Sequence, residues 1–175
     1  MLNSILSILY AILILFTSQT QSINVTSSVD FTENIFSVNL SDTGYEKLCV
    51  SNSSPVIIQT KEQFQDYVSN FSSYSNKQFF EFFESISEEY FAVNALLAVV
   101  HHSPVTGLGF DITNVIINDN KTIFEYDYFD GVYGDYVMGD GQSFTLLIAE
   151  VKKSDIINTE NLVTKATQVY SRDDL

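Results

Sequence analysis

The apolar residues of this chain change their spacing near Phe91, and that change constrains the fold more than any other feature. Before it, Phe64, Tyr67 and Phe71 recur at i, i+3 and i+7, which is the spacing of one face of an α-helix. After it, residues 96–100 (LLAVV) form a continuous apolar run, which is typical of a central strand. A chain that carries both patterns in one stretch predicts an α+β fold.

Two capping boxes predict where the helices begin. In residues 60–63 (TKEQ), the Thr60 hydroxyl can accept a hydrogen bond from the backbone N–H of Gln63, whose side chain reaches back. Residues 75–78 (SNKQ) repeat the signature. Aromatic stripes at helical spacing usually belong to a core, and we assign both stripes to it. The second stripe consists of Phe79, Phe82, Phe83 and Ile86.

Short apolar or alternating runs predict strands at residues 35–40, 55–59 and 144–151. Residues 110–117 and 122–129 flank an Asn-rich turn and predict a β-hairpin. We assign 101–109 and the Gly- and Asp-rich segment 130–142 to loops, and 156–170 to a weak helix. The predicted fold is therefore α+β, a mainly antiparallel β-sheet or sandwich with one or two amphipathic helices after the N-terminal strands.

The first residues predict a secretory signal peptide. Residues 5–16 are apolar except for Ser7, and small or polar residues follow as far as Ser22. This run is too short to cross a bilayer, which takes about 20 residues. The alternatives are an uncleaved anchor and a helix buried in the fold. With a signal peptide at 1–22, residues 23–170 form a single α+β domain, residues 171–175 form a polar tail, and the mature form has no integral membrane span.

Two further features fit the secretory route. The tail ends in Arg172, Asp173, Asp174 and Leu175, which is close to the K-D-E-L retrieval signal except that Asp174 stands where Glu is usual. Sequons of the form N-x-[ST] predict N-glycosylation. They begin at Asn24, Asn39, Asn52, Asn70 and Asn120. The predicted location is therefore the endoplasmic reticulum lumen or the outside of the cell.

The acidic composition limits the partners. The 22 Asp and Glu residues against 8 Lys and Arg residues give a formal net charge of -14. Such a chain repels nucleic-acid phosphates and anionic lipids, so we expect neither as a partner. Cations or a basic protein face suit it better. Cys49, the only cysteine, cannot close a disulfide within the chain; we expect it buried in a strand, with a disulfide to another chain as the alternative.

Residues 56–153 resemble the C-terminal domain of PrcB-like protease-complex proteins. The resemblance is carried by residues 91–94 (FAVN), the strand 96–100, the segment 104–110 (PVTGLGF) and the last strand, 144–153. Relative to the family's P-T-G-G-Y form, Val105 and Leu108 are inserted. The Pro-x-Thr-Gly segment is also similar, more weakly, to the binding loop of chagasin-type inhibitors of papain-like peptidases. Both likenesses imply association with, or control of, a peptidase.

The sequence contains no arrangement typical of catalysis. His101 and His102 are the only histidines, and adjacent residues on a strand point to opposite faces, so they make a poor metal pair. No G-x-S-x-G elbow occurs. We therefore expect no catalytic residue and no cofactor. Four aspartates in and before the Gly-rich segment are weak candidates for a Ca²⁺ site or for a hydrolase acid–base pair. They are Asp127, Asp130, Asp135 and Asp140.

These observations favour a protein-binding module. Loops 101–109 and 130–142 follow sequential strands and are expected to meet at one edge, and the second combines Tyr, Gly and Asp, a composition that suits contact surfaces. The expected partner is a protein, with a peptidase as the specific hypothesis, and the oligomeric state stays open. A Ca²⁺- or glycan-binding module is the alternative function, and a hydrolase is the third. The predicted binding residues are Pro104, Thr106, Gly107, Phe110, Tyr133 and Tyr136.

Overall fold

The computed structural model describes residues 26–50, 55–72, 75–105, 107–118, 121–129, 140–156 and 161–169. The strands are β1 (Thr26–Ser28), β2 (Phe31–Val38), β3 (Val56–Ile58), β4 (Asn94–Val105), β5 (Gly109–Asn118), β6 (Lys121–Phe129), β7 (Asp140–Lys152) and β8 (Asn161–Val169). The helical segments are α2 (Asp42–Tyr45), the π-helical η1 (Glu46–Val50), α3 (Lys61–Val68), α4 (Lys77–Ser85), α5 (Tyr90–Val93) and the 3₁₀ turn η2 (Lys153–Ile156). Within these ranges, no helix has both the length and the apolarity needed to cross a bilayer.

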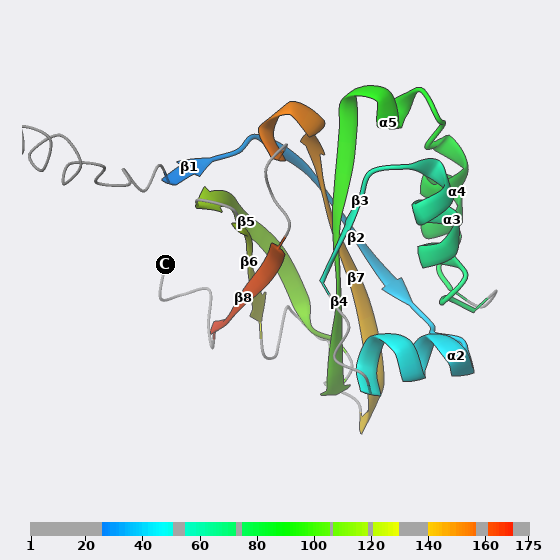
Figure 1. Ribbon diagram of the computed structural model, residues 1–175. Coiled ribbons are helices and arrows are strands. Elements are labelled where there is room, and N and C mark those ends of the chain that lie inside the picture. The colour runs from blue at the N-terminus through cyan, green and yellow to red at the C-terminus, as the bar shows by residue number, and fades with distance from the viewer. Residues whose placement is uncertain are drawn as a thin grey trace, which may run out of the picture.

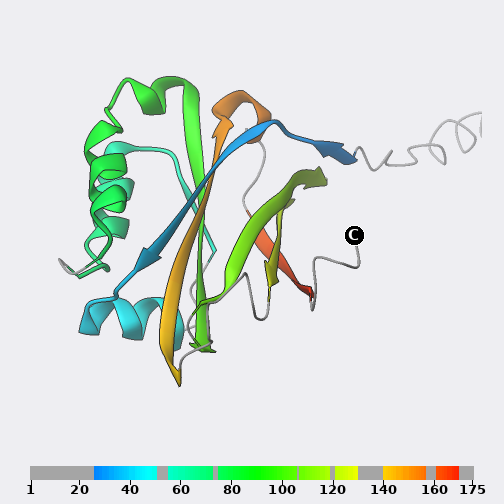
Figure 2. The same cartoon turned by 180° about the vertical axis from the view of Figure 1, so that it is seen from behind.

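The elements form three layers (Figure 1). The middle layer, here called the central sheet, has the strand order β2-β7-β4-β3, and the outer sheet has the order β1-β5-β6-β8. Helices α3 and α4 cover one face of the central sheet, and the outer sheet lies against the other, as the view from behind in Figure 2 also shows. The strand pairs are antiparallel except β6 with β8. The predicted α+β fold with mainly antiparallel sheets is confirmed.

The central sheet is buried on both faces, which explains its continuous apolar runs. In β4, Leu96 and Ala98 belong to the core on the helix side, whereas Leu97 and Val99 belong to the core between the two sheets. Strand β7 divides its apolar residues in the same way. Because side chains alternate between the faces of a strand, a strand with two buried faces needs an apolar residue at every position.

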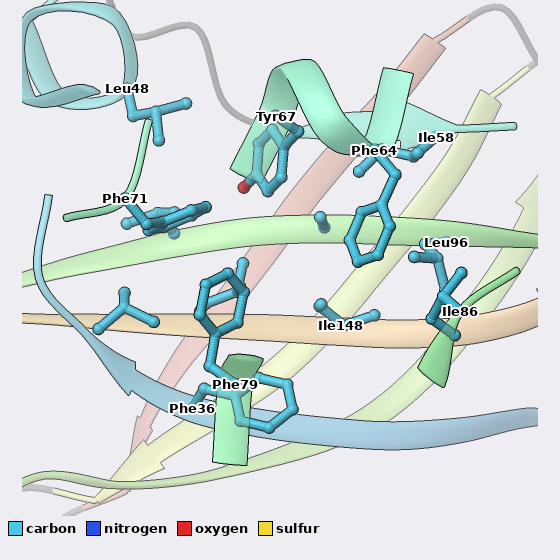
Figure 3. Close-up of a cluster of buried hydrophobic side chains, with 14 of the residues drawn as sticks. Phe36, Leu48, Ile58, Phe64, Tyr67, Phe71, Phe79, Ile86, Leu96 and Ile148 are labelled. Carbon is cyan, nitrogen blue, oxygen red and sulfur yellow. The ribbon is translucent and has the colours of Figure 1, made fainter. Parts of the chain in front are cut away.

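Aromatic side chains fill the core between the helices and the central sheet (Figure 3). Phe64 of α3 and Phe79 of α4 are fully buried. The ring of Phe79 meets Phe36 of β2 with a centroid separation of 5.8 Å. Each fully buried Phe side chain contributes about 1.5–3 kcal/mol of transfer free energy. The two aromatic stripes expected from the sequence therefore do form a core.

The first predicted capping box begins α3. The hydroxyl oxygen of Thr60 accepts a hydrogen bond from the Gln63 N–H at 3.1 Å. The Gln63 side chain also reaches back, but its Oε1 accepts from the N–H of Gln59, at 2.7 Å, one residue earlier than the box predicts. The helix start therefore agrees with the prediction, and the reciprocal bond ties the end of β3 to α3.

The second helix, α4, is capped one residue later than predicted. Asn76 Oδ1 accepts from the N–H of Gln78 at 2.8 Å, so Asn76 is the cap. Ser75 is unavailable for capping, because its hydroxyl exchanges hydrogen bonds with the backbone N–H and C=O of Asn39, each at 3.0 Å. The long-range hydrogen bonds to Asn39 therefore take the place of the predicted helix cap by Ser75.

Strand β4 continues to Val105, where the sequence predicted a loop from His101 onward. The extension pairs with β7, from His101 opposite Thr145 to Val105 opposite Asp140. Its register shifts between Ser103 and Val105, which leaves Pro104 at the irregularity. Proline lacks an N–H and is tolerated in strands at such bulges. The loop assignment was wrong for 101–105 because the proline fits a bulge.

Two other local assignments were also wrong. Residues 161–169 form β8, parallel to β6, rather than the weak helix predicted for 156–170. Pairing along all of β6 outweighs the weak local preference, and β8 contains several β-branched residues that suit a strand. The segment around Cys49 is the π-helical turn η1 and not a strand.

Candidate functional site

Two connections join the central sheet to the outer sheet at one end of the molecule. Residues 106–108 lead from β4 to β5, and residues 130–139 lead from β6 to β7. The residues that flank them are paired, Val105 with Asp140 and Gly109 with Phe129. The described ends of the two predicted loops therefore lie together, at the end of β4 that is opposite to α5 (Figure 1). We call this region the loop end.

The structure describes three of the predicted binding residues at the loop end. Pro104 and Gly107 are exposed, and Phe110 is half-buried. Gly107 has a φ of 88°, in the left-handed region that favours glycine. Thr106, Tyr133 and Tyr136 lie outside the described residues.

His101 lies in an aromatic cluster just inside the loop end. Its ring centroid is 5.0 Å from that of Phe110 and 4.9 Å from that of Tyr128. Its Nδ1 is 3.1 Å from the hydroxyl oxygen of Tyr126. His102 faces the other way and stacks on Phe144 at 4.9 Å. As the strand alternation predicted, the two imidazoles cannot share a metal.

Burial keeps this cluster uncharged. It lowers the pKa of His101 below 6.5, with a smaller contribution from His102, so the imidazole is mainly neutral at pH 7. Burial, followed by Tyr128, raises the pKa of Tyr126 to about 12. A neutral imidazole held by a neutral phenol is a packed, hydrogen-bonded arrangement that suits a rigid contact surface.

A second candidate site lies at the opposite edge of the central sheet, beside β3. A cavity of about 350 Å³ opens between β3, η1 and α3, within the size range of ligand pockets. Its lining residues are Lys47, Leu48, Val56, Ile57, Ile58, Gln63, Asp66 and Tyr67. We call it the β3 pocket.

Tyr67 is the only buried polar residue among those that line the β3 pocket. The residue is 5% exposed, and its hydroxyl has no hydrogen-bond partner among the described residues. Figure 3 shows the hydroxyl oxygen on the side where Leu48 and Phe71 lie. Burial raises the pKa of this phenol, so it stays protonated and can donate. The sequence analysis assigned Tyr67 to the core. The only sequence feature that could have pointed to a polar group in this pocket was the Tyr hydroxyl in an otherwise apolar stripe.

A third candidate site is a polar cavity of about 440 Å³ where β2, β7 and α5 meet. Glu150 lines it and is already paired: Oε2 accepts from the Tyr90 hydroxyl at 2.6 Å, and Oε1 accepts from Asn34 Nδ2 at 2.7 Å. Lys152 donates to Asn94 Oδ1 at 3.0 Å. These hydrogen bonds make the cavity part of a structural network rather than an open binding site.

The Ca²⁺ candidates do not form a described metal site. In the described part of the chain, no three or more His, Cys, Asp or Glu residues are grouped so that they could hold a metal ion. Asp127 faces Asp111 across the β5–β6 hairpin. Asp130 and Asp135 lie outside the described residues, and of Asp140 only the backbone is described.

The structure describes the asparagines of two predicted sequons, and these two side chains differ in exposure. Asn39 is exposed, whereas Asn70 is 3% exposed. The Asn70 Nδ2 donates to the carbonyl oxygens of Tyr67, at 2.6 Å, and Asp66, at 3.3 Å. A sugar on that nitrogen would compete with this packing, so the fold disfavours glycosylation at Asn70. Asn24, Asn52, Asn120 and the tail Arg172, Asp173, Asp174 and Leu175 lie outside the described residues.

Together, these observations define an α+β protein with an uncharged aromatic cluster beside the loop end and a mainly apolar pocket at a sheet edge. No protein-family model, curated protein or solved structure matches the chain. The resemblance to PrcB-like and chagasin-type proteins therefore stays a prediction.

Proposed function

We propose that this chain is a protein-binding module of the secretory pathway and that the loop end is its contact surface. The observation that carries the proposal is the pairing of the flanking residues, Val105 with Asp140 and Gly109 with Phe129. It brings the described ends of the β4–β5 and β6–β7 connections to one place. Binding residues are commonly found on loops that a rigid scaffold positions, and here the scaffold is a sheet buried on both faces.

The chemistry of the loop end supports binding rather than catalysis. The His101 imidazole is enclosed by Phe110 and Tyr128 and hydrogen-bonded to Tyr126. Aromatic side chains offer large contact areas at a low cost in conformational entropy. With a formal net charge of -14, the chain favours a partner with a basic face. The partner class implied by the family resemblance is a peptidase, and this remains part of the proposal.

The contact surface is tested by placing one charge at each end of the molecule. Pro104 is exposed at the loop end, and Ala92 is exposed on α5 at the start of β4. Partners are recovered from a secretory-compartment extract with tagged wild type, Pro104→Lys and Ala92→Lys. The proposal predicts that Pro104→Lys loses a partner that wild type and Ala92→Lys both retain. Equal recovery by all three rejects the loop end as the contact surface.

The peptidase hypothesis has a separate readout. If the recovered partner is a peptidase, its hydrolysis of a peptide substrate should change when the purified wild-type chain is added, and should change less with Pro104→Lys. If the recovered partner has no peptidase activity, the protein-binding proposal stands and the peptidase hypothesis is rejected.

The secretory route is tested on the mature protein itself. The intact mass is expected to lack about the first 20 residues, and glycopeptide mapping is expected to find a sugar at exposed Asn39 and none at buried Asn70. A chain that retains Met1 and carries no sugar would remove the secretory assignment.

A further inference from the structure

The walls of the β3 pocket are mainly apolar. Leu48 and Ile58 are buried at these walls, and Val56 and Ile57 add aliphatic side chains from β3. Tyr67 is also buried and its hydroxyl is shielded from solvent, so the carbon atoms of this residue line the cavity rather than its oxygen. The walls therefore offer a ligand van der Waals contacts and the removal of apolar surface from water.

The polar side chains of the lining already have partners. Lys47 Nζ is 3.3 Å from Asp66 Oδ2, so the one cation and the one anion of the lining neutralise each other. Gln63 Oε1 accepts a hydrogen bond from the N–H of Gln59 at 2.7 Å. A charged ligand would lose hydration here without gaining a counter-ion that is not already paired. The chemistry of the lining therefore favours a neutral, apolar ligand.

The edge of β3 offers little to a polypeptide. No described strand pairs with the side of β3 that faces away from β4, but this edge has only three residues, 56–58. Pro55, before it, has no N–H to donate. The backbone N–H and C=O of Gln59, after it, are bonded to the side chains of Gln63 and Lys153. An added strand would find few main-chain partners, so a small molecule suits the site better than an extended segment.

The volume of the cavity sets the size of the ligand. At about 350 Å³, the β3 pocket is roughly twice as large as an apolar cavity of about 150 Å³ that holds one benzene molecule. It also lies within the size range of natural ligand pockets. A molecule with about eight to twelve carbon atoms therefore matches the space.

We propose that the β3 pocket binds a small, neutral, apolar molecule of about eight to twelve carbon atoms. The molecule packs against Leu48, Ile58 and the ring of Tyr67, and the Lys47–Asp66 ion pair takes no part in its recognition. None of the lining residues belongs to the loop end, so this site does not rest on the function proposed there.

The first test compares two neutral alcohols that differ only in chain length. Octanol and hexanol are titrated into the purified full chain, and binding is followed by the amide resonances in NMR spectra. The proposal predicts that octanol shifts the resonances of residues 47–48, 56–58 and 66–67 and that these shifts saturate. Each buried CH₂ group changes affinity by about fourfold, so hexanol should bind about tenfold more weakly or worse.

The second test asks whether the ligand must be neutral. Octanoate has a similar alkyl chain with a carboxylate head, and wild type should bind it several-fold more weakly than octanol, because Lys47 is already paired with Asp66. Lys47→Met keeps an unbranched apolar side chain without the ammonium group and should bind octanol as wild type does. Lys77→Met is the matched control, because Lys77 pairs with Glu81 at 3.0 Å on α4, which contributes no lining residue.

The third test fills the cavity. Val56→Phe adds bulk from β3 and should weaken octanol binding about tenfold or more, whereas Pro104→Lys, at the loop end, should bind octanol as wild type does. The comparison of the two alcohols uses the wild-type chain, so it stands even if Val56→Phe does not fold.

Two outcomes would overturn the proposal. The first is the absence of saturable shifts at residues 56–58 with octanol. The second is octanoate that binds more tightly than octanol to wild type and Lys77→Met but loses this advantage in Lys47→Met, which would make the pocket a site for an anionic amphiphile.

Discussion

Gly44 carries the tightest packing constraint among the described glycines. A Cβ built at this position would lie 1.9 Å from the carbonyl oxygen of Asn70. That oxygen also accepts hydrogen bonds from the backbone N–H and the hydroxyl of Ser41, at 2.9 and 3.0 Å. The start of α2 and the end of α3 therefore meet backbone to backbone, and only glycine permits the contact.

We predict that Gly44→Ala destabilises the protein by about 3 kcal/mol, because overpacking outweighs the better helix propensity of alanine. The measurement is urea unfolding. Gly107→Ala is the matched control, because its Cβ would meet nothing within 4 Å. Its only cost in folding free energy is the left-handed backbone conformation, about 1–2 kcal/mol. A cost for Gly44→Ala no larger than that of the control would contradict the close approach.

For the buried hydroxyl of Tyr67 we predict the opposite effect, a substitution that stabilises the protein. Because the free protein gives this group no described partner, Tyr67→Phe should stabilise the chain by about 1 kcal/mol. The control is Tyr126→Phe, which removes the hydroxyl bonded to His101 and should destabilise it by a similar amount. Thermal or urea unfolding of both variants tests the difference, and equal signs for the two would argue against an unpartnered Tyr67.

His101 makes the stability of the loop end depend on pH. Burial lowers its pKa in the folded chain below 6.5, so the unfolded chain binds the proton first as the pH falls. The stabilisation is therefore complete above about pH 7 and is lost progressively below 6.5. We predict that the stability advantage of wild type over His101→Gln shrinks between pH 7.5 and 5.5. Urea unfolding at a series of pH values measures it; an advantage that grows toward acid would reverse the sign of the pKa shift.

At the scale of elements, the β5–β6 hairpin contains an unfavourable pair. Asp111 and Asp127 are directly opposite each other, and like charges in that position destabilise a sheet. We predict that Asp127→Asn stabilises the protein by about 0.2–1 kcal/mol at low salt, and that the gain diminishes at high salt. Glu125→Gln is the control, because Glu125 is bonded to Lys165 at 2.9 Å and its loss should not stabilise. The free energy of unfolding at two salt concentrations decides between these outcomes.

Elements whose signals are local could be predicted from the sequence. Thr60 predicted the start of α3, and the aromatic stripes predicted α3 and α4. The Asn-rich turn predicted the β5–β6 hairpin. Elements that depend on distant partners could not. β8 forms because it lies along β6, and residues 101–105 extend β4 because β7 continues beside them.

The candidate sites differ in the same way: one could be predicted from local sequence signals and the other could not. Sequence reasoning found Pro104, Gly107 and Phe110 at the loop end, because turn residues and strand ends leave local signals. It did not find the β3 pocket, because its walls come from η1, β3 and α3. An unpartnered hydroxyl is a property of the packed fold, and an amphipathic stripe with one Tyr among Phe residues does not reveal it.

At the scale of the whole molecule, the three layers anchor the described strand ends at the loop end. The central sheet is covered on one face by helices and on the other by the outer sheet, with a separate core on each side. Both connections at the loop end run between the central and outer sheets. Their described ends are therefore anchored in two sheets at once, an arrangement that lowers the entropic cost of the binding proposed for this surface.

The most direct measurement is site-specific photo-crosslinking in the cells that make this protein, with the same photoreactive residue placed at Pro104 or at Ala92. The account predicts a crosslinked partner protein from position 104 and none from position 92. A partner captured only from position 92, on α5 at the far end of β4, would contradict the loop end as the contact surface.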